Sequence, residues 1–120
     1  MTTPTTEFFD DLGRRGHEPL LENLTGSFRF EITDGTKSER WLVGVDKGDV
    51  TVSHRNGAAD CTLRAPRALF DAIARGEANA VAAVLRGAVT MDGEWGLLVR
   101  FQRLFPSPPR AAAAPGGGGS

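Results

Sequence analysis

Three side chains in the sequence could support nucleophilic or metal chemistry: Cys61, His17 and His54. A reactive cysteine needs a neighbouring base or positive charge, and the residues immediately flanking Cys61 include no Lys, Arg or His. We therefore expect Cys61 to be a buried structural residue. His54 has no second histidine at ligand spacing, so we predict no metal site. His17 and Glu18 lie in a segment broken by Gly and Pro, where we expect a solvated surface.

Two acidic segments could support acid–base chemistry or anion binding. Asp10 and Asp11 are adjacent, but we expect them on an exposed helix surface without a pocket. Gly93-Glu94-Trp95 precedes an apolar segment, where the free N–H groups of a helix start could bind an anion. The acidic Asp92 and Glu94 argue against an anion and favour interaction with the helix dipole. The chain also contains no nucleotide-binding glycine motif, no Gly-x-Ser-x-Gly and no zinc-protease histidine pair. We predict no catalytic residue, no cofactor and no enzyme activity.

Composition limits the partners. The 120 residues carry a net charge of −1, with no cluster of Lys and Arg that could neutralise nucleic-acid phosphates. No run approaches the roughly 18 apolar residues of a membrane span, so we expect no stable membrane insertion. The N-terminal segment lacks the basic and apolar regions of a secretory signal, which favours a cytoplasmic location. We expect one domain over residues 1–105 and a disordered Pro/Ala/Gly-rich tail over residues 106–120.

The middle of the chain alternates apolar and polar residues, the pattern of strands buried on one face. The inward positions of the successive strands are Phe28, Phe30 and Ile32; Trp41, Val43 and Val45; Val50 and Val52; and Cys61 and Leu63. Asp34-Gly35, Asp46-Lys47-Gly48 and Asn56-Gly57 separate these strands, and such pairs favour tight turns. The pattern predicts an antiparallel meander of four strands.

Helical periodicity predicts the cover for this sheet. Residues 6–24 favour an interrupted helix, with Phe8, Phe9 and Leu12 on one face. Pro66 suits a first helical position before Leu69, Phe70 and Ile73. Asn79 can cap a second helix that carries Val81, Val84 and Leu85 on one face. A short strand is expected over residues 88–91, and residues 95–105 predict a final helix with a wide apolar face and a weak start at Gly96.

The stretch from Gly26 to Phe105 resembles the sterol carrier protein 2 (sterol-binding) domain family, in its bacterial stand-alone form. The similarity is carried by FRFEITDG, by ADCTLRAPRALFDAIARGEANAVAAVLRG and by AVTMDGEWGLLVRFQRLF. The family has Gly-Asp before its final helix, where this chain has Gly93-Glu94. The resemblance implies an α+β fold in which helices cover one face of a five-stranded, mainly antiparallel sheet. It also implies an apolar cavity or tunnel between sheet and helices that binds lipids.

From this resemblance we expect non-catalytic binding or transfer of a fatty acid, acyl-CoA, sterol-like or isoprenoid molecule. Large apolar side chains on facing elements are the candidates to line the cavity. They are Phe28, Phe30, Trp41, Val43, Phe70, Ile73, Val84, Met91, Leu97, Leu98 and Phe101. The alternative is a ligand-free domain that forms a homodimer or docks on a biosynthetic enzyme. Leu42, an apolar residue on the polar outer phase of its strand, is the one feature that favours this alternative.

Overall fold

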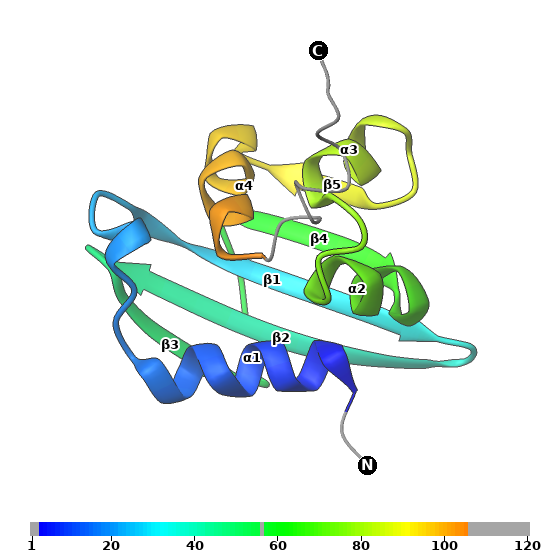
Figure 1. Ribbon diagram of the computed structural model, residues 1–120, viewed down its shortest axis with the longest axis horizontal. Coiled ribbons are helices and arrows are strands. Elements are labelled where there is room, and N and C mark those ends of the chain that lie inside the picture. The colour runs from blue at the N-terminus through cyan, green and yellow to red at the C-terminus, as the bar shows by residue number, and fades with distance from the viewer. Residues whose placement is uncertain (1–2, 56, 106–120) are drawn as a thin grey trace, which may run out of the picture.

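A long hairpin forms the centre of the sheet in the computed structural model, which describes residues 3–55 and 57–105. Strands β1 (Thr25–Asp34) and β2 (Lys37–Asp46) pair antiparallel along their whole length, with Phe28 opposite Val43 and Phe30 opposite Trp41 (Figure 1). The predicted turn at Asp34-Gly35 is confirmed, and Gly35 takes a positive φ of 65°. Because the apolar positions alternate, all four of these paired side chains are buried on the same face.

The fourth strand departs from the predicted meander. Strand β3 (Asp49–Ser53) pairs antiparallel with β2, but β4 (Cys61–Pro66) pairs parallel with β1 on the other side of the hairpin. The sheet order is therefore β3-β2-β1-β4-β5. The prediction of four consecutive antiparallel neighbours was wrong, although the sheet is mainly antiparallel.

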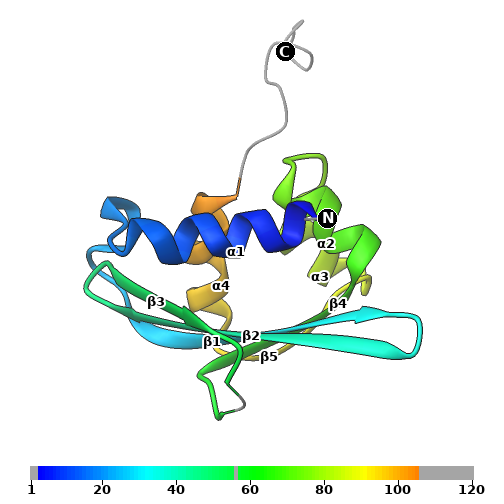
Figure 2. The ribbon, with the colours of Figure 1, turned by 90° about the horizontal axis from the view of Figure 1, so that it is seen from below.

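The register explains how a short connection can join β3 to β4. β3 ends opposite Leu42, and β4 begins opposite Phe28, which itself lies opposite Val43. The chain therefore crosses the sheet without returning along it, and the described residues 54–55 and 57–60 belong to a crossover that is shorter than parallel strands usually need. Figure 2 shows this crossover beneath the sheet, on the face opposite the helices. A guanidinium N–H of Arg29 donates to the carbonyl of Gly57 over 3.2 Å and attaches the crossover to that face.

Strand β5 (Thr90–Gly93) completes the sheet by pairing antiparallel with β4. It begins two residues later than the predicted 88–91 and includes the expected turn residues Asp92 and Gly93. Gly93 has a φ of 118°, and a Cβ at this position would clash with the carbonyl oxygen of Asp60. Only glycine can therefore make this close approach between β5 and the start of β4.

The helices all lie on one face of the sheet (Figure 2), as the sequence predicts. They are α1 (Pro4–Arg15), the 3₁₀ turn η1 (Pro19–Leu21), α2 (Arg67–Ala74), α3 (Ala80–Leu85), α4 (Trp95–Phe101) and the 3₁₀ turn η2 (Gln102–Leu104). Pro66 precedes α2 rather than beginning it. The first helix ends at Gly16, whose φ of 70° gives a left-handed cap. The helix predicted over 95–105 consists of α4 followed by η2.

Helix α3 buries a different face from the one that its sequence predicts. Its predicted cap is confirmed, since the side chain of Asn79 accepts from the N–H of Ala82. However, α3 buries Ala80 and Ala83, whereas Leu85 is 75% exposed. The side-chain oxygen of Gln102 accepts from the N–H of Ala80 over 2.8 Å and from that of Val81 over 3.2 Å. This contact fixes the start of α3 against η2.

No helix in the described ranges 3–55 and 57–105 is long and apolar enough to cross a membrane. The predicted tail over residues 106–120 lies outside the described residues.

Candidate functional site

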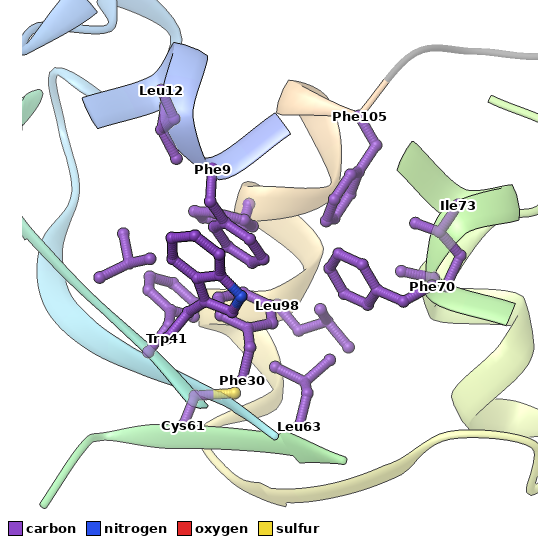
Figure 3. Packing of buried hydrophobic residues seen from close by; sticks show 14 of the residues in the cluster. Phe9, Leu12, Phe30, Trp41, Cys61, Leu63, Phe70, Ile73, Leu98 and Phe105 are labelled. Carbon is purple, nitrogen blue, oxygen red and sulfur yellow. The ribbon is translucent and has the colours of Figure 1, made fainter. Parts of the chain in front are cut away.

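The predicted lining residues belong to one apolar cluster between the sheet and the helices, or pack against it. Figure 3 labels five of them: Phe30, Trp41, Phe70, Ile73 and Leu98. β1 and β2 supply the floor of this cluster, while α2 and α4 supply its walls. Eight of the eleven candidates are at most 3% exposed, namely Phe28, Phe30, Trp41, Val43, Phe70, Ile73, Leu98 and Phe101. The other three, Val84, Met91 and Leu97, are partly buried and pack against this cluster. The fold therefore brings the predicted set to one region, where Met91 lies opposite Leu63 on the neighbouring strand.

Aromatic contacts join the elements across this region. The ring centroids of Phe28 and Phe101 are 4.6 Å apart, and those of Phe30 and Phe70 are 5.6 Å apart. Phe30 also lies 5.5 Å from Phe101. Rings at these separations are in contact, so protein side chains fill this part of the site in the structure. A ligand that bound here would have to separate them.

Helix α1 contributes side chains that the predicted lining omits. Phe9 stacks on Trp41, with centroids 4.7 Å apart and an angle of 18° between the ring planes, and it also stacks on Phe70 at 5.6 Å. Phe105, after η2, lies 5.7 Å from both Phe70 and Phe101. The apolar face of α1 was visible in the sequence. Which strands this face covers depends on tertiary packing, and helical periodicity alone does not predict that.

Polar contacts at the rim attach the helices to one another and to the sheet. Thr5 is fully buried on α1, and both its hydroxyl and its backbone N–H donate to Oδ1 of Asp71 on α2, over 2.6 and 3.1 Å. The Arg67 guanidinium contacts Glu39 and donates to the Thr3 hydroxyl. These contacts close the side of the cluster where the N-terminal ends of α1 and α2 meet.

Helix α4 has fewer polar attachments. A guanidinium N–H of Arg100 donates to the carbonyl of Asn23 over 3.2 Å, and Gln102, just after α4, holds the start of α3. Its inner face is held by the apolar packing of Leu98 and Phe101. At Gly96, near the start of the helix, a Cβ would extend into open space, with no neighbouring atom within 4 Å.

Hollows in the described surface occur on both sides of the sheet. Two beside α4 are bordered by Asn23, Leu24 and Arg100, and others lie on the outer face. One of about 450 Å³ is bordered by Ser27, Gly44 and Thr51 on the strands and by Arg55 and Ala58 on the crossover. Its volume would suit a small ligand. Its borders are mostly polar or small side chains, in contrast to the apolar cluster on the inner face.

The predicted role of Cys61 is confirmed. Its side chain is fully buried, and burial, together with the nearby Asp60 and Asp92, raises the pKa of the thiol to about 11. The thiolate required of a nucleophile or metal ligand is therefore disfavoured. No group of three or more potential metal-ligating side chains occurs in the part of the chain that the structure describes.

Each histidine contacts neighbouring side chains or backbone on the surface of the fold. His54 is exposed and covers the ring of Trp41 at a centroid distance of 4.0 Å, while its Nδ1 lies 3.0 Å from the carbonyl oxygen of Arg40. His17 contacts Asp49 over 2.8 Å and Glu22 over 3.4 Å, and hydrogen bonds to these carboxylates raise its pKa.

The expectation that Glu18 is surface-solvated was wrong. Its side chain is 8% exposed, because it pairs with Arg15 over 2.7 Å and accepts from the N–H of Leu20 at the start of η1. The nearby Gly and Pro residues suggested a solvated loop. The chain instead forms the 3₁₀ turn η1, which begins at Pro19, and the Glu18 carboxylate caps its start. Asp10 and Asp11 are exposed on α1, as predicted.

The fold and the interior cluster together define a small α+β domain in which helices enclose an apolar region against one face of a mixed sheet. The model of the SCP-2 sterol transfer family matches residues 9–106. The chain belongs to this family, a family of lipid binding or transfer, and the predicted resemblance is confirmed.

Individual relatives agree with this assignment. Human sterol carrier protein 2 is 30% identical over 97 residues, which cover 78% of this chain and 18% of that protein. The chain thus spans less than a fifth of the length of this curated relative. Apo sterol carrier protein 2 from Yarrowia lipolytica has a TM-score of 0.70 at 19% identity, covering 83% of this chain and 88% of the other. The palmitate complex of sterol carrier protein 2 from Aedes aegypti has a TM-score of 0.66 at 23% identity, covering 86% and 94%. These two structures establish similarity of fold.

Proposed function

We propose that this chain binds one apolar small molecule between the inner face of the sheet and the helices, and that it acts as a non-catalytic carrier. The ligand classes are those expected from the sequence: a fatty acid, an acyl-CoA, or a sterol-like or isoprenoid lipid. The supporting observation is the continuous apolar cluster that joins β1, β2, α2 and α4 at the predicted positions. The similar fold of the Aedes aegypti protein accommodates palmitate, which also supports the proposal.

Binding requires the cluster to open. Helix α4 is the element proposed to move, because its inner face contacts the sheet through side chains and its polar attachments are few. Displacing α4 separates Phe101 from Phe28 without breaking a hydrogen bond between strands. Local opening of this kind needs less free energy than global unfolding.

The energetics are adequate for a carrier. Burying about twelve methylene groups contributes on the order of 10 kcal/mol at ~0.8 kcal/mol each. Losses of translational, rotational and conformational freedom oppose this by several kcal/mol, and separating the aromatic rings adds a further penalty. The remaining few kcal/mol correspond to an affinity of about micromolar or weaker, which allows both uptake and release.

A titration with a fluorescent fatty-acid analogue tests the proposal. We expect saturable binding of about one molecule per chain, together with an unchanged monomer peak in size-exclusion chromatography of the loaded protein. Absence of saturation up to high micromolar ligand, or binding confined to aggregated protein, contradicts the proposal.

The alternative is a ligand-free dimer or accessory domain, and native mass spectrometry of protein purified from cells separates it from the carrier. A co-purifying mass of a few hundred daltons supports the carrier, whereas a ligand-free dimer supports the alternative. The crossover partly covers Leu42, the outer-face residue that suggested the alternative. Leu42 is partly buried, and a Cβ on Gly57 of the crossover would lie 3.6 Å from its Cδ2 atom. The predicted cytoplasmic location stays a prediction.

A further inference from the structure

The indole nitrogen of Trp41 is buried without a hydrogen-bond acceptor. Among the described residues, two buried side-chain nitrogens lack a partner, and the other is Nε of Arg29 on the outer face of the sheet. Other N–H groups of the Arg29 guanidinium do have partners, the carbonyl of Gly57 and the carboxylate of Glu31. Trp41 has a single N–H group, which can only donate. Its side chain is the stronger candidate for a missing partner because the residue is 3% exposed.

This N–H group points into the proposed lipid site. The ring of Phe9 covers one part of the indole and His54 contacts it at the edge of the sheet. Figure 3 shows the nitrogen on the side of the ring that faces the middle of the cluster, toward Phe70, rather than toward the strand that carries it. An apolar interior offers no acceptor there, and leaving a buried donor unpaired carries a free-energy penalty.

The two buried polar side chains of the described residues are already engaged. Thr5 and Glu18 are the buried polar residues of the described core. The Thr5 hydroxyl donates to Asp71, and Glu18 is bound by Arg15 and by the backbone of η1. Neither is available to Trp41 in this arrangement.

We propose that the Trp41 indole N–H is the polar anchor of the lipid site and donates to a neutral oxygen of the ligand. This proposal rests on the carrier function above and narrows its ligand class. The partner would be the oxygen of a hydroxyl, ester, ketone or undissociated carboxyl group within an otherwise apolar molecule. An ionised carboxylate is disfavoured at this N–H group, because the buried described residues include no Lys, Arg or His and a single N–H group cannot compensate the desolvation of a full charge. A fatty acid would therefore bind with its carboxyl group undissociated, or with an ionised carboxylate outside the cluster. Arg67, a cation at the rim, is bound to Glu39 and Asp34.

The second tryptophan makes the anchor directly observable. Trp95 is 39% exposed at the start of α4 and outside the proposed lining. In the Trp95→Phe protein, one indole N–H resonance remains and reports on Trp41 alone. Methyl laurate and dodecane serve as matched probes, since they share the alkyl chain and differ in the ester oxygens. We expect methyl laurate to move the indole proton resonance downfield and dodecane to leave the proton near its apo position.

Affinity gives a second readout of the same bond. Trp41→Phe keeps an aromatic ring and removes the donor. We expect it to weaken methyl laurate binding by about three- to tenfold and to leave dodecane binding within twofold, whereas Trp95→Phe changes neither. If Trp41→Phe does not fold, the resonance experiment decides alone, because it leaves Trp41 intact.

The outcomes separate the anchor from the carrier function. Equal resonance shifts with the two probes, or equal losses of affinity in Trp41→Phe, overturn the anchor and leave the carrier standing. If neither probe binds saturably to the unaltered chain, both the carrier function and the anchor are wrong.

Discussion

The hydroxyl of Thr5 on α1 donates to Oδ1 of Asp71 on α2 across 2.6 Å, and the residue that donates is fully buried. This bond links two helices through residues that are 66 positions apart in the chain. It closes the rim of the apolar cluster beside Phe9 and Phe70. A short hydrogen bond to a carboxylate is stronger than one between neutral groups.

Thr5→Val should therefore lower the free energy of unfolding by about 1–3 kcal/mol. The variant preserves shape and the backbone N–H bond to Asp71 but removes the hydroxyl donor. Thr33→Val is the control, since the Thr33 hydroxyl contacts the carbonyl of Ala65 at a longer 3.4 Å on a strand that tolerates valine. Urea denaturation measures the free energy of unfolding of both variants. Equal losses of this free energy would show that the hydrogen bond between α1 and α2 contributes no more than the Thr33 contact.

Two glycines close together in the chain should respond oppositely to alanine. Gly93→Ala introduces a Cβ that clashes with the Asp60 carbonyl and forces alanine to a φ of 118°, so we expect a loss of at least about 2 kcal/mol. Gly96→Ala places a Cβ in open space within α4, where alanine should stabilise by about 0.5–1 kcal/mol. Thermal and urea unfolding check both signs. Similar effects at the two positions would contradict the structure of the β5–α4 junction.

Leu98 and Val99 test whether α4 forms a wall of the site. They are adjacent, but Leu98 is buried against the cluster and Val99 is 45% exposed. If Leu98 borders the ligand, Leu98→Trp should reduce fatty-acid affinity by about tenfold or more at nearly unchanged stability, and Val99→Trp should change neither. A destabilisation of about 1–3 kcal/mol with unchanged affinity would mean that Leu98 is only a core residue. Phe101→Trp, at the next inward position, provides an independent repeat.

The raised pKa of Cys61 predicts a loss of stability at alkaline pH. The folded state binds the thiol proton more tightly than the unfolded state, because the pKa rises from 9.0 to about 11 on burial. The corresponding stability is present below about pH 9 and is lost as the pH rises toward 11. The difference in unfolding free energy between the natural chain and Cys61→Ala should therefore shrink or change sign across this window. A difference that stays constant from pH 8 to about pH 11 would contradict the burial of the thiol.

Labelling by iodoacetamide gives an independent check on the same residue. At pH 8, we expect the folded chain to react at least about a hundredfold more slowly than the urea-unfolded chain. Comparable rates would mean that Cys61 is accessible as a thiolate.

Local patterns were sufficient to predict much of the sheet and the interior. Alternation placed Phe28, Phe30 and Trp41 on the buried face, because side chains on a strand alternate strictly between its two sides. The turn at Asp34-Gly35 followed from the conformational preference of glycine. These properties depend on neighbours along the chain, which is why the sequence reports them.

Long-range pairing could not be derived in the same way. The alternation of Cys61 and Leu63 is the same whether β4 lies beside β3 or beside β1, so the parallel pairing of β4 with β1 has no local signal. The orientation of α3 depends on Gln102, a polar residue seventeen positions after Leu85 that gave no sign of capping another helix. Phe9 illustrates the same limit, since its helical face was evident but its stacking on Trp41 was not.

The location of a bound lipid tests the central claim most directly. Isotope-filtered nuclear Overhauser spectra of the chain with carbon-13-labelled palmitate identify the side chains that touch the ligand. We predict contacts from the acyl chain to Phe28, Leu98 and Phe101 on the inner side of the sheet. Contacts confined to Thr51 and Ala58, which border the hollow on the outer face, would contradict a site between the sheet and the helices.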